Sequence, residues 1–316
     1  MTERATGVDT RPRPPGGLVR GTLRTLRNEF TDKERRLGYI LVTPALAIIL
    51  AIALFPLLYA IWLSLQEIII NQSSSFVGFQ NYFDMAQDPD FHSALINTTV
   101  FTVLSVSLEL VLGMAIALAL NRAFKGRGIA RATALAPWAF PPAIAAVMWR
   151  LMFQDQVGGG ILAYLIRSSG IYTHPILGSD SALIGAAVLV DVWKTTPFMA
   201  LLLLAGLQVI PQEVYEASRV DGATSWQQFW RVTLPLVRPA MLVALLFRTL
   251  DAWRVYDLLW VMGNRQLNSL SVYVYNGVKI SQLDFSLGNA AAVFVFLSSI
   301  AIAFLFIKVL GTRAVD

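Results

Sequence analysis

The sequence EASRVDGATSWQQFWRVTLP, residues 216–235, separates two of the most apolar tracts of the chain. It is dense in charge, glycine and tryptophan, whereas a plain linker needs only to be polar and flexible. Residues 212–220 fit a short helix with one apolar face. The second half of the segment, around Trp226 and Trp230, fits another helix after a tight turn at Gly222. Helices this short are marginal in isolation, so we expect the segment to pack against a partner protein.

The composition is that of an all-α integral membrane protein. The chain of 316 residues is 56% hydrophobic and 14% charged, with a mean hydropathy of +0.59, whereas about a quarter of the residues of soluble domains are charged. Six apolar tracts are each long enough to cross a hydrocarbon core, which takes roughly 20 helical residues. Their continuous apolarity favours helices over the alternating strands of a barrel. The predicted spans are 38–66, 94–121, 129–154, 182–208, 236–262 and 285–310.

Lysine and arginine residues predict the orientation of these spans. Nine of them precede the first span and four lie in 122–131, whereas 67–93 has none and 155–181 has only Arg167. The positive-inside rule therefore places both termini, the loop 122–131 and the loop 209–235 in the cytoplasm. The chain is accordingly predicted to be a multi-pass protein of the cell membrane.

Residues 1–37 are expected to form a cytoplasmic tail. Its first part, with RPRPPGG, has nothing to bury, and residues 18–36 can form a basic amphipathic helix on the inner membrane surface. The first apolar tract is too long for a cleavable signal peptide. The net charge of +5 follows from the basic cytoplasmic segments, so it gives no reason to invoke nucleic acid, and the absence of cysteine excludes disulfides.

Several ionisable residues fall inside the predicted spans, where each costs about 2.5–3.5 kcal/mol at a helix centre. Asp191 and Lys194 are three apart, and the fifth span repeats charges of alternating sign at steps of three, which makes opposite charges neighbours on a helix. Two interpretations stay open: the charges pack helices together, or they line an aqueous path for a polar solute. Nearby aromatic rings favour the path, because rings with carboxylate and guanidinium groups suit a sugar. The candidate path residues are Asp191, Trp193, Lys194, Asp251, Trp253, Arg254, Tyr256 and Asp257.

Three further charges are assigned structural roles. Arg248 is expected to help pack the fifth span, and Glu109, alone in the second span, to be hydrogen-bonded inside the bundle. Arg150 is expected at the membrane interface, near the outer end of the third span.

The motifs of nucleotide-binding and catalytic proteins are absent. The sequence has no G-x-x-x-x-G-K-[ST] phosphate loop, so any ATP must be bound by another chain. It has only two histidines and neither a G-x-S-x-G nor an H-E-x-x-H motif, so no catalytic or metal-ligating residues are predicted. These absences favour a transporter over an enzyme.

The opening segment resembles a family motif. The cytoplasmic loop of permease subunits of binding-protein-dependent ABC importers carries the pattern EAA, then G, then I-x-LP. The matching residues here are Glu216-Ala217-Ser218, Gly222 and Val232-Thr233-Leu234-Pro235. Ser218 replaces the third alanine, and Val232 replaces the isoleucine. RTLDAWRVYDLLWVM at 248–262 and LGNAAAV at 287–293 resemble the sugar branch of the family, so the resemblance covers nearly all of 38–310.

The resemblance implies a type I importer fold, with 38–310 as the permease domain and 209–235 as a loop that carries a coupling helix. It implies a second, homologous permease subunit, two copies of an ATPase subunit that bind ATP and magnesium, and an extracytoplasmic sugar-binding protein. The cargo would be a sugar, a disaccharide such as trehalose, and this chain would bind no cofactor. The implied ATPase-coupling residues are Glu216, Ala217, Ser218, Asp221, Gly222, Leu234 and Pro235.

An alternative is a secondary transporter that uses the intramembrane carboxylates to couple solute movement to protons or sodium. It leaves the segment 212–235 without a role.

Overall fold

The computed structural model describes residues 36–68, 74–122, 125–154, 159–170, 175–264, 267–279 and 285–311. The chain divides into two compact units, Met1–Tyr59 and Ala60–Asp316. The predicted tail 1–37 lies almost wholly outside the described residues, so its amphipathic helix stays a prediction. The domain boundaries drawn from the sequence also stay predictions.

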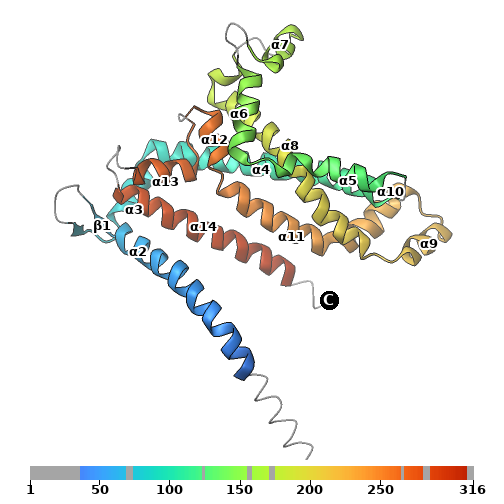
Figure 1. Ribbon diagram of the computed structural model, residues 1–316, viewed down its shortest axis with the longest axis horizontal. Coiled ribbons are helices and arrows are strands. Elements are labelled where there is room, and N and C mark those ends of the chain that lie inside the picture. The colour runs from blue at the N-terminus through green and yellow to red at the C-terminus, as the bar shows by residue number, and fades with distance from the viewer. Residues whose placement is uncertain are drawn as a thin grey trace, which may run out of the picture. The chain divides into compact units, whose positions relative to one another are not determined.

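The described elements are helices, apart from one pair of very short strands (Figure 1). The strands pair antiparallel, with Gln66 opposite Phe76 and Glu67 opposite Ser75. In chain order the elements are η1 (Leu50–Leu54), α2 (Phe55–Ser64), β1 (Gln66–Glu67), β2 (Ser75–Phe76), α3 (Gln80–Gln87), α4 (Pro89–Asn121), α5 (Arg127–Leu135), η2 (Ala136–Ala139), α6 (Pro142–Phe153), α7 (Ile161–Ser168), η3 (Ile176–Gly178), α8 (Asp180–Gln208), α9 (Gln212–Val220), α10 (Ser225–Gln228), η4 (Phe229–Thr233), α11 (Leu234–Trp253), α12 (Asp257–Met262), α13 (Leu270–Val278) and α14 (Phe285–Gly311).

Among the described residues, five helices are long and apolar enough to cross a membrane. They are Arg36–Ser64, Pro89–Asn121, Asp180–Gln208, Ser225–Trp253 and Phe285–Lys308. A sixth span would be the pair Arg127–Ala139 and Pro142–Phe153, which bends by 88° at Pro141 and Pro142. Adjacent prolines remove backbone donors and break a helix, so the third predicted span, 129–154, is not one straight helix. The predicted fold class, an all-α integral membrane protein, is confirmed.

Both π-helical turns lie just before a proline. The turn Leu50–Leu54 precedes Pro56, and the turn Phe229–Thr233 precedes Pro235, where the N–H of Leu234 donates to the carbonyl of Phe229. A proline ring crowds the carbonyl four residues earlier, and a widened turn lets the helix continue past it.

The predicted second short helix around Trp226 is wrong as a separate element, because it is the start of the long helix Ser225–Trp253.

The predicted fifth span, 236–262, is also wrong as one continuous helix. α11 ends at Trp253, Tyr256 adopts φ −126° and ψ −68°, and α12 begins at Asp257. The hydroxyl of Ser269 donates to the carbonyl of Val255 at 2.8 Å, which satisfies a group freed by the break. Arg254 and Asp257 therefore do not share a helix, and the predicted charge ladder ends at Asp251.

After the break, α12 packs against α6. Nη1 of Arg150, on α6, donates to the carbonyl of Val261 at 3.2 Å. Arg150 thus bonds α6 to α12, and its place at the membrane interface stays a prediction.

Within the unit Ala60–Asp316, α4 packs along α8, and α11 packs against both (Figure 1). Small residues allow these helices to approach closely. A Cβ built on Gly113 of α4 would lie 2.8 Å from Cγ of Met199 of α8. A Cβ on Gly206 of α8 would lie 2.4 Å from Cβ of Ala240 of α11. The two glycines thus set the spacing of the three helices that carry the charged site.

We expect Gly206→Ala to lower the melting temperature of the purified full-length chain, because the new methyl overlaps Ala240 and Val237, at an overpacking cost of about 1–3 kcal/mol. Gly185→Ala, on the same helix, is the control, since no heavy atom lies within 4 Å of its Cβ position. Thermal unfolding in detergent, followed by tryptophan fluorescence, compares the two variants. An equal change in both would contradict close packing at Gly206.

Candidate functional site

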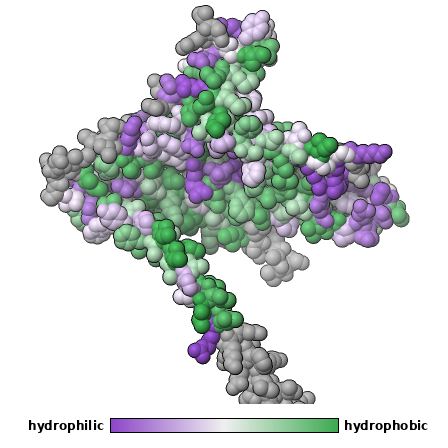
Figure 2. All heavy atoms as spheres, in the orientation of Figure 1, coloured by the Kyte–Doolittle hydropathy of each residue, from purple (hydrophilic) through white to green (hydrophobic). Residues whose placement is uncertain are grey.

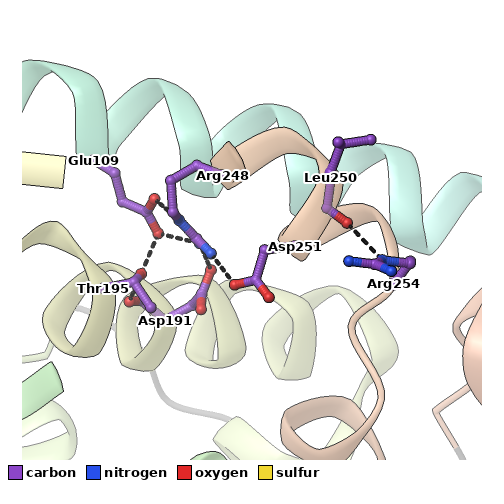
Figure 3. A network of polar contacts seen from close by, with 7 residues as sticks. All are labelled: Glu109, Asp191, Thr195, Arg248, Leu250, Asp251 and Arg254. Carbon is purple, nitrogen blue, oxygen red and sulfur yellow. Dashed lines mark hydrogen bonds and ion pairs between the residues drawn. The ribbon is translucent and has the colours of Figure 1, made fainter. Parts of the chain in front are cut away.

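Arg248 is the centre of a buried charge cluster (Figure 3). Its side chain is 2% exposed and donates from Nε and Nη2 to the two carboxylate oxygens of Glu109, at 2.6 and 2.7 Å. Nη2 also donates to Asp191 at 2.9 Å, and Nη1 donates to Asp251 at 2.5 Å. The hydroxyl of Thr195 donates to Glu109 at 2.5 Å. One guanidinium thus joins α4, α8 and α11.

The residue types suit this task. A guanidinium is planar and has five donors, so it can bond one carboxylate with two parallel hydrogen bonds and still reach others. A lone charge at this depth would cost several kcal/mol, whereas the fully buried Glu109 and Arg248 satisfy each other. The structure confirms that Glu109 is hydrogen-bonded inside the bundle and that Arg248 packs helices together.

A cavity of about 170 Å³ lies beside the cluster, at the break between α11 and α12. Lys194 is only 9% exposed. Its ammonium lines the cavity and makes no hydrogen bond or ion pair with the described parts of the chain. It is therefore available to a solute. The predicted path residues that line the cavity are Asp191, Lys194, Asp251, Arg254, Tyr256 and Asp257.

The two tryptophans predicted for the path do not line this cavity. Trp193 packs edge-on against Trp149, with ring centroids 5.5 Å apart. Nε1 of Trp253 donates to Oγ of Ser298, on α14, at 2.9 Å. Both lie one or two positions from a lining residue, and neighbours in sequence point about 100° apart on a helix. The two tryptophans thus lie beside the cavity and not on its wall, and their place on a solute path stays a prediction.

Sequence reasoning missed Thr195 on the wall of the cavity and the aromatic neighbours of Tyr256. Thr195, four residues after Asp191 and on the same helical face, lines it. Tyr256 also lines it and continues into an aromatic group: its ring stacks on Trp260 at 5.8 Å and lies 5.3 Å from Tyr275. Tyr275 belongs to α13, which carries no charge that would have drawn attention to it.

The short helix α9 forms the second candidate site. It ends in a Schellman motif, in which Ala223 N–H donates to the carbonyl of Ser218 and Gly222 N–H to that of Arg219, both at 3.0 Å. Gly222 adopts φ +80°, which confirms the predicted tight turn. None of the residues of α9 is buried. Its exposed surface is free to contact another protein.

α9 is also bonded to the helix that follows it. Nε2 of Gln228 donates to Oγ of Ser218 at 3.0 Å, and Oγ1 of Thr233 donates to the hydroxyl of Tyr215 at 3.3 Å. The replacement of alanine by Ser218 in the family pattern thus supplies an acceptor.

The predicted coupling residues fall into two groups. Glu216, Ala217 and Ser218 lie on α9, with Asp221 and Gly222 at its end. Leu234 and Pro235 begin α11, where Leu234 packs against an apolar cluster of α4, α8 and α11.

A helical membrane protein with a charged cavity at a broken helix and an exposed helix on one loop has the features of a transport-system membrane subunit. Residues 109–315 match the family of binding-protein-dependent transport system inner membrane components. The chain belongs to this family and is a permease subunit of an ABC importer.

Curated relatives extend the match over most of the chain. It is 36% identical to the trehalose/maltose transport system permease protein MalF of Thermococcus litoralis, over 90% of this chain and 97% of that one. It is 38% identical to the trehalose transport system permease protein SugA of Mycobacterium tuberculosis, over 89% of this chain and 91% of that one.

A solved structure supports the fold. A chain of a bacterial ABC transporter involved in the import of the acidic polysaccharide alginate superposes with a TM-score of 0.76, covering 91% of this chain and 99% of that chain. At 20% sequence identity, this likeness shows the fold alone.

Arg248→Met should destabilise the chain by about 3–5 kcal/mol, because it leaves Glu109 and Asp191 buried without their cation. Asp251→Asn is the matched test of the exposed end of the cluster, where the carboxylate is 71% exposed, and we expect a loss below about 1 kcal/mol. The order of the melting temperatures in detergent checks this difference. Equal losses in the two variants would rule out Arg248–Glu109 as the main contact.

Proposed function

We propose that the chain carries a sugar, a disaccharide such as trehalose, through the cavity beside Arg248, driven by ATPase subunits that act on α9. Two relatives of 36% and 38% identity, named for trehalose transport, support the choice of cargo. The observation that carries the proposal is the cavity at the α11–α12 break, where charged and aromatic groups meet.

The lining of the cavity suits a sugar. Sugar hydroxyls both donate and accept, so they can pair with Asp251 and Asp257 as acceptors and with Lys194 and Arg254 as donors. The ring of Tyr256 offers a flat apolar surface to the C–H face of a pyranose. The charges of these four side chains cancel, because two are negative and two are positive. This balance favours a polar, uncharged solute over an ion.

The size of the cavity favours a shared path. At about 170 Å³ it is smaller than the roughly 300–1,000 Å³ of sites that enclose a small molecule. We infer that this chain supplies one wall and that a second, homologous permease subunit supplies another.

The contacts of α9 suggest how force would reach the path. A rigid α9 held by an ATPase subunit would pull on Ser225–Trp253 through the Gln228–Ser218 and Thr233–Tyr215 hydrogen bonds. The far end of that helix carries Arg248 and Asp251, so its displacement would act on the cavity wall and, through Glu109, on α4. Helix shifts of this kind underlie alternating access in transporters.

The remaining partners and the orientation are part of the same proposal. Two copies of an ATPase subunit would bind ATP and magnesium, and an extracytoplasmic sugar-binding protein would deliver the cargo. Both termini and α9 would face the cytoplasm, as the arginine distribution predicts. Family membership weighs against the ion-coupled alternative, because the transport systems of this family depend on a binding protein.

Asp257→Asn should reduce sugar uptake by about tenfold or more, since it removes a charged acceptor from the cavity at a cost of roughly 1.5–3 kcal/mol per hydrogen bond. Trp253→Phe, which faces Ser298 on α14, should leave the apparent affinity for the sugar unchanged. Uptake of radiolabelled disaccharide by cells carrying each variant, at matched membrane levels, gives the comparison. A stronger defect in Trp253→Phe would place the path on the other side of α11.

Gly222→Val should abolish uptake while the protein still inserts and folds, because a β-branched residue at φ +80° opens the end of α9. Gly170→Val is the matched control, since Gly170 also has a positive φ (+70°) and open space around its Cβ but lies after α7. Co-purification with the ATPase subunit and substrate-stimulated ATP hydrolysis are the readouts. If Gly170→Val uncouples the complex as severely as Gly222→Val, α9 has no special role.

A further inference from the structure

A second cavity, of about 720 Å³, lies where α4 and α8 end and α5, α9 and α10 begin. Figure 2 shows hydrophilic residues gathered over this end of the molecule. Four arginines line the cavity: Arg122, Arg127, Arg131 and Arg219. Its described lining contains no aspartate or glutamate. We call it the arginine cavity.

The guanidinium of Arg131 has unmet hydrogen-bonding capacity. Its Nε and Nη2 are both buried and have no acceptor among the described residues. Arg122 and Arg127 likewise make no side-chain hydrogen bond or ion pair within the part of the chain that the structure describes. Buried donors of a charged group are costly when left without acceptors. The described residues therefore supply no anionic partner for the arginines of this cavity.

The start of α5 adds to this positive potential. The helix begins at Arg127, after Gly126, and its first turn carries no acidic residue. The free N–H groups at a helix N-terminus carry about half a positive elementary charge, so an arginine there is unfavourable unless an anion is nearby.

General attraction of basic residues to the membrane surface does not explain this arrangement. Basic residues that follow the positive-inside rule extend along the surface and keep their charged ends in contact with water or headgroups. The buried nitrogens of Arg131 lie instead in a protein-walled cavity, with Tyr215 of α9 and Gln228 on its other side.

We propose that the arginine cavity binds a phosphate-bearing anion, which accepts hydrogen bonds from Arg131 and Arg127 on α5 and from Arg219 on α9. Phosphate oxygens match the paired donors of guanidinium groups. The phosphate belongs either to a soluble molecule or to a phospholipid headgroup that enters from the membrane. An effect on transport rests on the coupling role proposed for α9, whereas the binding itself does not.

The first experiment measures soluble phosphate. The purified full-length chain, without partner subunits, is titrated with inorganic pyrophosphate by calorimetry at low ionic strength. Arg131→Gln should weaken binding by about tenfold or more, the effect of losing one charge-assisted pair. Arg231→Gln is the matched control, because Arg231 is exposed, lies in η4 near the same end and does not line the cavity. It removes the same charge and should change binding by less than about twofold.

The second experiment measures lipid. The same variants are released from bilayer discs of phosphatidylglycerol or phosphatidylcholine, and bound lipid is detected by native mass spectrometry. Retained phosphatidylglycerol that is lost in Arg131→Gln and kept in Arg231→Gln identifies a lipid headgroup as the source. Pyrophosphate binding with the same dependence on Arg131 identifies a soluble phosphate.

Three results would overturn the proposal. One is that the unaltered chain binds neither probe. Another is that Arg131→Gln and Arg231→Gln weaken binding equally, so that overall charge rather than the cavity holds the anion. The third is that Arg131→Gln binds both probes normally but no longer co-purifies with the ATPase subunit, which would mean that the cavity receives a carboxylate of a protein. Because these binding measurements use the chain alone, they can fail or succeed whatever its cargo is. The melting temperature of Arg131→Gln, which removes no hydrogen bond or ion pair among the described residues, checks that the variant is folded.

Discussion

The rest of the structure depends on the paired hydrogen bonds between Arg248 and Glu109. The two residues are 139 positions apart in sequence and lie on different helices, yet neither is exposed enough to be solvated by water. Each charge is tolerated only in the presence of the other. The register of α11 against α4 is therefore fixed at this level, and Asp191 fixes α8 to the same point. Asp251 extends the cluster to the cavity, so the group that holds the helices together also shapes the wall of the cavity.

Irregular backbone carries much of the functional geometry. The break after Trp253 ends one helix and exposes Tyr256 and Asp257 to the cavity. The 88° bend at the paired prolines brings Pro142 into the same lining. In a membrane protein such breaks are stable only where other groups satisfy the freed backbone, as Ser269 does for Val255. The cavity thus forms where regular helix stops, and the long helices around it provide a rigid frame.

The sequence predicted the features whose signals are local. Apolar length placed the membrane helices, and Gly222 placed the turn after α9. The break at Arg254–Tyr256 was missed because those residues contain neither glycine nor proline, and the packing of α12 on α6 decides it instead. Trp193 and Trp253 were assigned to the path from their residue type and their charged neighbours in the sequence. The side of the helix that each one faces depends on its position, because successive residues turn by about 100°. The pairing of Glu109 with Arg248 is a tertiary contact between distant helices, and the spacing of residues in one sequence does not predict it.

The π-helical turn Phe229–Thr233 has a consequence for how this protein can change over time. It inserts one residue into a helix, so everything before it is rotated by about 100° relative to an uninterrupted α-helix. Trp226, before the turn, is therefore turned outward, 70% exposed, while Val237 beyond the turn stays fully buried. Gain or loss of a single residue in this turn would change the surface that the start of the helix Ser225–Trp253 presents to a binding partner. Arg248 would keep its contacts with the carboxylates. Recognition of a partner and integrity of the membrane core can thus diverge separately along one continuous helix.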